Sequence, residues 1–234
     1  MFIPLYDKNA LTYVRFQYVT ILLIAACCAV FFLQATGLEQ RAVATFAVIP
    51  RELLFVNWIG GAANGPNDVL PIPESYTLVS YMFFHGDLVH LIGNMMFLWV
   101  FGDNVEDAVG HIKYLIFYIL CGIAAAAAHV LISGNSPNPL IGASGAVSGV
   151  IAAYLMLHPR VSVWVLAFKF LPLQISAAIA LGFWIALQIF MVMTPQVGPV
   201  AWWAHIGGLV AGAILILFFR RPGVPLFDRG SPSS

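Results

Sequence analysis

Side chains suited to acyl transfer stand in three apolar segments of the sequence. These segments are HLIGN at 90–94, GASG at 142–145 and AHIGG at 204–208. A serine hydroxyl becomes a useful nucleophile when a neighbouring base, usually histidine, takes its proton. We therefore predict Ser144 as nucleophile and His205 as base. Asn94, His90 and the backbone N–H of Ser144 are candidate donors to the oxyanion that develops during such a reaction.

Each of these residues could also have a purely structural role. The positions of the acidic residues indicate whether a catalytic dyad or a triad is present. Ser144 could bond back to its own helix, and His90 and Asn94, one helical turn apart, could pair with each other. No Asp or Glu lies between Ala108 and Phe227. This favours a Ser-His dyad over a triad, with His205 oriented by packing or by a hydroxyl such as that of Ser148.

The sequence gives no support for metal-dependent or aspartate-dependent hydrolysis or for a cofactor site. It has no His-Glu-x-x-His motif for zinc and no pair of aspartates within its apolar segments, so we expect no metal and no cofactor. Two histidines and Asp87, in the segment 85–90, are too few and too local for a metal site. The three cysteines lie in apolar runs and are interpreted as small buried side chains.

Composition predicts the setting of these residues. The chain of 234 residues is 61% hydrophobic and 9% charged, with a mean hydropathy of +0.92. Soluble domains carry about 25% charged residues. So much apolar surface must face lipid, which makes the chain an integral membrane protein with the lipid bilayer as its partner. The formal net charge of zero gives no indication of a nucleic-acid partner.

Charge-free stretches predict an all-α, polytopic bundle of six transmembrane helices. The stretches cover 16–34, 88–102, 114–159 and 170–219. Pro- and Asn-rich breakers at 134–139 and 194–199 divide each of the last two into a pair of helices. We expect a cytoplasmic tail at 1–15, one membrane domain at 16–221 and a second cytoplasmic tail at 222–234. The external loop, about 35–84, is apolar enough to be partly helical and to lie in the interface.

Lys and Arg predict the orientation. Eight of the ten basic residues precede the first span, follow the sixth or lie between spans on the same side; only Arg41 and Arg51 lie on the other. Cytoplasmic loops carry the excess of Lys and Arg, so both termini are predicted to be cytoplasmic. Spans two, four and six then run inward from the outer face. His90, Asn94, Ser144 and His205 are consequently all expected at the same outer depth.

Glycines near these residues predict close helix contacts. Gly142 and Gly145 allow a tight turn around Ser144. Gly145 and Gly149 on the fourth span, and Gly208 and Gly212 on the sixth, form small-xxx-small faces. Such faces let two helix backbones approach closely enough for Ser144 and His205 to share a hydrogen bond.

In this order and on these spans, the motifs resemble the signature set of the rhomboid proteases, over residues 8–221. The resemblance implies an intramembrane serine endopeptidase. Ser144 and His205 would form its catalytic pair, and His90 and Asn94 would help form its oxyanion site. It also implies a structural role for Glu106, within Gly102-x-x-x-Glu106-x-x-x-Gly110. Its substrates would be single-pass transmembrane proteins cut near the outer face. A bacterial inner membrane is the expected location.

The sequence departs from the family pattern at two places. Ser148 stands where some members carry an aromatic residue that packs on the catalytic histidine. Trp58 and Arg51 are separated where many members have an adjacent Trp-Arg pair. The other histidines (His85, His111, His129 and His158) are expected to be structural, and Gly182 and Gln188 are expected to be packing and interface residues.

Two other classes of protein were weighed. A catalytically inactive rhomboid-like protein would be marked by loss of the serine or the histidine, and both are present. A small transporter or channel would be marked by a charged residue in the middle of a span or by a broken, pseudo-symmetric helix pair. The sequence shows neither mark.

Overall fold

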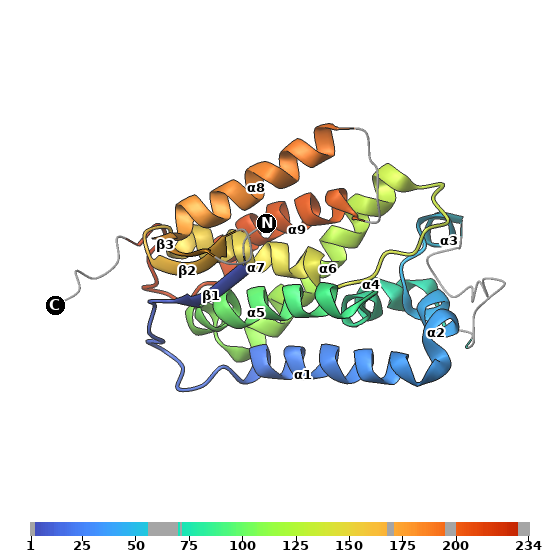
Figure 1. Ribbon diagram of the computed structural model, residues 1–234, viewed down its shortest axis with the longest axis horizontal. Helices are drawn as coiled ribbons and strands as arrows, with labels where there is room; N and C mark the ends of the chain where they lie inside the picture. The colour runs from blue at the N-terminus through green and yellow to red at the C-terminus, as the bar shows by residue number, and fades with distance from the viewer. Residues whose placement is uncertain (1–2, 56–69, 71, 168–170, 195–199, 229–234) are drawn as a thin grey trace.

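Six apolar helices dominate the computed structural model, which describes residues 3–55, 70, 72–167, 171–194 and 200–228 (Figure 1). In chain order they are α1 (Tyr18–Leu33), α5 (Leu88–Val109), α6 (His111–Ser133), α7 (Ser144–Leu157), α8 (Ala177–Met193) and α9 (Trp202–Phe219). Four stretches are long and apolar enough to cross a membrane: Tyr18–Thr36, α5, α6 and α9. The helices α7 and α8 are shorter but also apolar. The predicted class, an all-α polytopic membrane protein, is confirmed, while six membrane crossings remain a prediction.

Short helices make up the segment between α1 and α5, as far as it is described. They are a π-helix (Gln34–Leu38), α2 (Glu39–Phe46), α3 (Pro50–Phe55), a 3₁₀ helix (Glu74–Tyr76), α4 (Thr77–Ser80) and a second 3₁₀ helix (Tyr81–Phe83). This segment is fastened to the loop before α7, because Val48 and Leu140 pair as a β-bridge and the Arg51 N–H donates to the Ser136 carbonyl. Trp58 lies outside the described residues.

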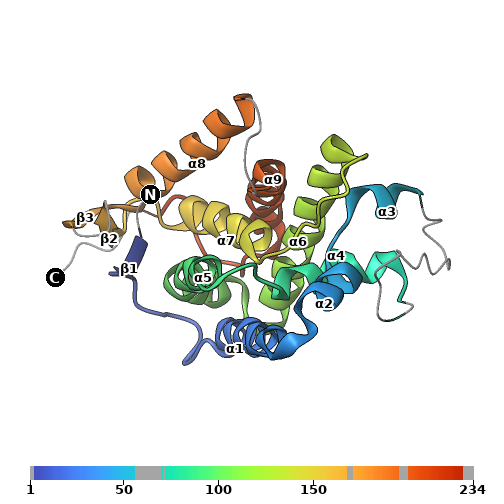
Figure 2. The same cartoon turned by 45° about the vertical axis from the view of Figure 1, so that its right-hand side comes forward.

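A small antiparallel sheet lies at the end of the bundle opposite α2 and α3 (Figures 1 and 2), and the sequence reasoning did not foresee it. Its strands are β1 (Ile3–Asp7), β2 (Ser162–Ala167) and β3 (Leu171–Ser176), in the order β1-β2-β3. In β2, Val163 and Val165 are buried and alternate with more exposed residues, which is the two-residue period of a strand. The charge-free stretch that begins near residue 170 thus opens as a strand, and its helix begins only at Ala177.

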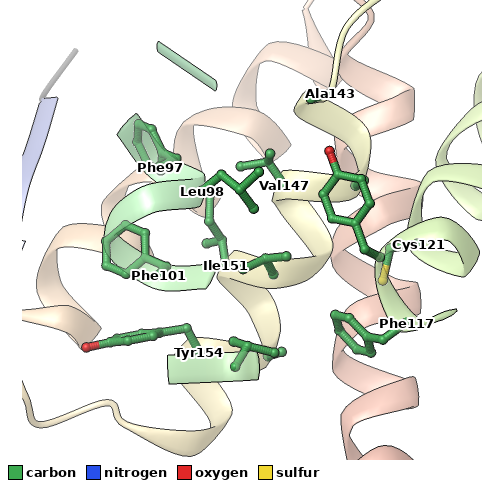
Figure 3. Close-up of a cluster of buried hydrophobic side chains, with 14 of the residues drawn as sticks. Phe97, Leu98, Phe101, Phe117, Cys121, Ala143, Val147, Ile151 and Tyr154 are labelled. Atoms are coloured by element: carbon green, nitrogen blue, oxygen red, sulfur yellow. The ribbon is translucent and has the colours of Figure 1, made fainter. Parts of the chain in front are cut away.

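The helix α7 occupies the middle of the bundle (Figure 2), with α1 and α8 on opposite sides of it. Fourteen residues suffice for α7 because most of it is enclosed by protein rather than by lipid. Figure 3 shows the chain from Ala143 to Tyr154, mostly α7, packed between α5 and α6. Phe101 of α5 meets Tyr154 of α7 edge to face, with ring centroids 4.8 Å apart. This packing fixes the position of the helix that begins at Ser144.

Buried carboxylates near the C-terminal end of α5 hold the N-terminal segment of the chain in place. Glu106 is fully buried and accepts hydrogen bonds from the backbone N–H groups of Val19 and Thr20, at 3.0 and 2.8 Å, and from the Thr20 hydroxyl. The first N–H groups of a helix have no partner within that helix and lie at the positive end of its dipole. Glu106 therefore caps α1 from a neighbouring helix, a geometric basis for the structural role that its motif implies. The adjacent Asp107 accepts three backbone N–H groups from residues 12–14.

Candidate active site

Ser144 is the first residue of α7, and the loop before it is held at several points. The Gly142 N–H donates to the carbonyl of Tyr81 at 3.0 Å. Gly142 has φ +115°, a conformation that residues with a side chain rarely adopt. A Cβ at this position would also lie 2.7 Å from the ring of His90. The turn that presents Ser144 thus depends on a glycine, as the sequence indicated.

The structure brings Ser144 and His205 together. His205 lies in the first turn of α9, and its Nε2 is 2.9 Å from the Ser144 Oγ. His205 is 8% exposed and Ser144 is partly exposed, so the pair is shielded without being sealed from outside.

Two glycines on α9 make this distance possible. A Cβ on Gly208 would overlap the carbonyl oxygen of Gly145, and a Cβ on Gly212 would overlap the carbonyl oxygen of Gly149. From the first contact to the second, the residue number rises by four in both helices, so α7 and α9 run in the same direction. Their first residues therefore lie at the same level of the bundle, which is where Ser144 and His205 stand. The glycine faces predicted from the sequence are in contact.

The imidazole of His205 is held by α8 and by its own helix. Its Nδ1 is 2.7 Å from the Gln188 Oε1. The rings of Trp184 and Trp202 lie 6.1 and 5.8 Å from it between centroids, the second edge to face. These two rings supply aromatic packing on His205 in a chain that has Ser148 one turn after the serine.

Two sequence-based expectations change here. We expected packing, or a hydroxyl such as that of Ser148, to orient His205. The Ser148 hydroxyl instead donates to the backbone carbonyl of Ser144 at 2.6 Å, within its own helix. Gln188, which we expected to be a packing and interface residue, is hydrogen-bonded to His205. A signal for it was present: Gln188 is the one amide, hydroxyl or charged side chain in the sequence of α8. A polar group in a membrane helix is a functional candidate by default.

His90 and Asn94 occupy one face of the first turns of α5, beside the serine loop. The ring of His90 lies against Gly142, two residues before Ser144. The Asn94 side chain is buried, and its amide donates to the His90 carbonyl at 3.0 Å. Asp87 caps this helix, since its carboxylate accepts the His90 N–H at 2.8 Å.

His85 supports the same loop. It is fully buried, its Nδ1 lies 3.3 Å from the Phe83 carbonyl, and its Nε2 lies 3.5 Å from the Ala143 N. Burial lowers the pKa of His85 to about 4, with the nearby His90 as a second cause. The imidazole is therefore neutral near pH 7, donates from Nδ1 to the carbonyl and accepts the Ala143 N–H. It braces the residue that precedes Ser144.

Two of the remaining histidines lie away from Ser144 and His205. His111 bonds to the carboxylate of Glu106 near the C-terminal end of α5, and the ring of His158 packs on Tyr154. Among the described residues, no group of three or more His, Cys, Asp or Glu side chains is arranged to hold a metal ion.

Comparisons with known proteins place the chain in a family. A family model described as "Rhomboid domain" matches residues 73–222. RHOMBOID-like protein 6, mitochondrial, of Arabidopsis thaliana is 29% identical over 142 residues, which cover 61% of this chain and 43% of that protein. RHOMBOID-like protein 12, mitochondrial, of the same plant is 26% identical over 209 residues, 79% of this chain and 60% of that protein.

A bacterial relative is also similar over a shorter stretch. Rhomboid protease GluP of Bacillus subtilis is 33% identical over 89 residues, which cover 38% of this chain and 17% of that protein. The chain spans less than two thirds of the length of each of these relatives. The matched domain includes His90, Asn94, Ser144, Gln188 and His205. The chain is an integral membrane protein of the rhomboid family.

Proposed function

We propose that this protein is an intramembrane serine endopeptidase that uses Ser144 and His205 as a catalytic dyad. The 2.9 Å contact between the Ser144 Oγ and the His205 Nε2 is the observation that carries the proposal. Such a contact is what a general base needs in order to take the serine proton. It joins residues 61 positions apart, on two helices that meet through their glycines.

The reaction would proceed by acyl transfer. The Ser144 Oγ attacks the scissile carbonyl carbon while its proton passes to the His205 Nε2. The carbonyl becomes an oxyanion, stabilised by the Ser144 N–H and by the Asn94 and His90 side chains. As the C–N bond breaks, His205 returns the proton to the leaving amine, and the acyl group remains on Ser144 as an ester. A water molecule, giving its proton to His205, then attacks the ester carbonyl; the C–O bond to Ser144 breaks, and His205 returns the proton to the Ser144 Oγ.

The position of Ser144 favours the N-terminus of α7 as part of the oxyanion site. The first N–H groups of a helix have no partner within it, and the helix dipole is positive at that end. A carbonyl oxygen that becomes negative beside Ser144 would meet these groups and the Asn94 and His90 side chains on α5. Because all these groups are fixed before substrate arrives, little reorganisation would be needed.

The expected substrates are transmembrane segments of other membrane proteins. A scissile carbonyl in an intact helix is engaged in hydrogen bonds and is shielded by side chains. A segment with small or helix-breaking residues near the outer face could unwind and reach Ser144. No cofactor or metal is required by this chemistry, and nucleic acid has no part in it.

Labelling with a fluorophosphonate probe tests whether Ser144 is an activated nucleophile. We expect the purified protein in lipid vesicles to be labelled. Ser144→Ala should not be labelled, and His205→Ala should be labelled far more slowly. Ser148→Ala is the matched control, since Ser148 lies one turn further along the same helix, and its labelling should be normal. Equal labelling of Ser144→Ala and the native protein would contradict the proposal.

We also propose that both termini are cytoplasmic, in a bacterial inner membrane. Arg160 and Arg221 lie at the end of the bundle that holds the sheet and the Glu106 cap: Arg160 precedes β2, and the Arg221 N–H donates to the Ala108 carbonyl. Lys169 and Arg229 lie outside the described residues. This clustering supports the orientation given by the Lys and Arg distribution.

Reporter fusions test this orientation. After Arg221, a reporter that works only in the cytoplasm should be active. Within residues 60–67, a reporter that works only outside the cytoplasm should be active. A reporter that is external after Arg221 would reverse the assignment.

A further inference from the structure

Gln188 is buried in the C-terminal half of α8, where its neighbours along the helix are half-buried or exposed. Its side chain is 3% exposed, whereas the next two residues, Ile189 and Phe190, are 49% and 60% exposed. Burying an amide is costly unless it is hydrogen-bonded. The buried side chain of Gln188 therefore depends on its hydrogen-bond partners. Those partners are the backbone of α8 on one side and His205 on the other.

The hydrogen bonds fix which way the amide points. The Gln188 Nε2 lies 3.3 Å from the carbonyl oxygen of Trp184, one turn earlier in α8. A carbonyl oxygen only accepts, so the amide NH₂ must point toward it. The Oε1 then faces the His205 Nδ1 at 2.7 Å. An amide oxygen also only accepts, so Nδ1 must carry the proton that is shared between them.

This orientation decides the state of the other imidazole nitrogen. A neutral imidazole has one N–H and one lone pair. With the proton on Nδ1, the lone pair is on Nε2, the atom that lies 2.9 Å from the Ser144 Oγ. The opposite tautomer would place an N–H toward the serine and could not take its proton.

We propose that Gln188 is a positioning residue, which selects the Nδ1–H tautomer of His205 and so makes Nε2 the base toward Ser144. Its catalytic importance rests on the function proposed above. Gln188 takes the place that a carboxylate occupies in a Ser-His-Asp triad, with a neutral oxygen in a buried setting. A neutral acceptor avoids the cost of burying an anion in the membrane. When His205 receives the serine proton, the Nδ1–H remains bonded to the same oxygen.

Nitrogen NMR of the full chain in lipid tests the tautomer directly. In protein labelled with ¹⁵N-histidine, the His205 signals are identified by their loss in His205→Ala. We expect the native protein to carry the proton on Nδ1 at neutral pH, and Gln188→Met to lose this preference. A native His205 protonated on Nε2 would overturn the proposal, whatever the variants do.

Turnover of a transmembrane substrate gives the second test. Gln188→Met keeps the length of the side chain but has no strong acceptor, and we expect kcat to fall on the order of 10- to 100-fold with little change in KM. Gln188→Glu restores an oxygen facing Nδ1 and should recover part of the loss, with a kcat between those of Gln188→Met and the native protein because a buried anion is costly. Phe190→Met is the matched control, since it changes an exposed residue of the same helix, and it should leave kcat unchanged.

The outcomes separate this inference from the proposed function. A native kcat for Gln188→Met, or no recovery by Gln188→Glu, would overturn the positioning role. If Ser144→Ala still cleaves, the proposed function fails, while the tautomer measurement still reports on the bond between Gln188 and His205.

Discussion

Replacing Ser144 or His205 with alanine is expected to remove proteolysis while the helical bundle remains folded. Ser144→Ala deletes the nucleophile, and His205→Ala deletes its base, so each should reduce the rate by about 10⁶-fold, the scale seen when a serine protease loses either residue. Neither substitution adds volume to the packed interior. The measurement is cleavage of a single-pass membrane substrate by purified protein in lipid, with thermal unfolding as the test of integrity.

Two further variants calibrate this result. Asn94→Ala should be milder, because losing one oxyanion donor costs about 10²- to 10³-fold. Ser148→Ala removes a hydroxyl of the same helix that donates to the Ser144 carbonyl, and its activity should be close to native. Cleavage at the native rate by Ser144→Ala would remove Ser144 from the mechanism. A loss in Ser148→Ala as large as in Ser144→Ala would indicate damage to the fold instead.

Gly208→Val is expected to cause a large loss of activity, through the distance between α9 and α7. Any Cβ at Gly208 would overlap the backbone oxygen of Gly145, an atom that cannot rotate away. The helix α9 must therefore move outward and carry His205 with it. A displacement of about 1 Å can cost on the order of 100-fold in rate. We expect cleavage per folded molecule to fall at least this far, and Gly212→Val to behave similarly.

The control for this prediction is a glycine with free space around it. A Cβ on Gly182 of α8 would meet no atom within 4 Å, so Gly182→Ala should keep its activity and its melting temperature. Overpacking typically costs about 1–3 kcal/mol of stability, so Gly208→Val should melt earlier as well. Activity and melting temperature must therefore be measured on the same preparations. A Gly208→Val protein that cleaves normally would contradict the need for close approach.

Composition and residue spacing were enough to predict the class of the fold and to single out Ser144, His205, His90 and Asn94 as candidate site residues. A chain with 9% charged residues has no way to bury its apolar surface except in lipid, so the membrane class follows from composition alone. The small-xxx-small spacing indicated which helices approach each other, because only glycine removes the atom that would keep two backbones apart. The contacts Gly208–Gly145 and Gly212–Gly149 have that arrangement.

Local strand structure was less visible in the sequence. Apolar, uncharged residues near 171–176 fit a membrane helix as well as a strand, and the pairing partner that decides between them, β2, depends on the folded arrangement. Propensity for strands is a matter of neighbours as much as of the residue itself. The chain therefore turns through a hairpin before α8 begins.

What only the tertiary structure decided is how His205 is held. Residue spacing made the Ser148 hydroxyl, one turn from the nucleophile, a candidate to orient His205. A serine within a helix readily bonds to the carbonyl four residues back, however, and Ser148 does so. Gln188 stood in the sequence as a lone amide in an apolar helix, with nothing to indicate which way it faced. Its rotation toward His205 depends on how α8 packs against α9, and that packing is set by side chains distributed over both helices. Spacing along one helix determines which residues share a face, and only the assembled bundle determines what that face meets.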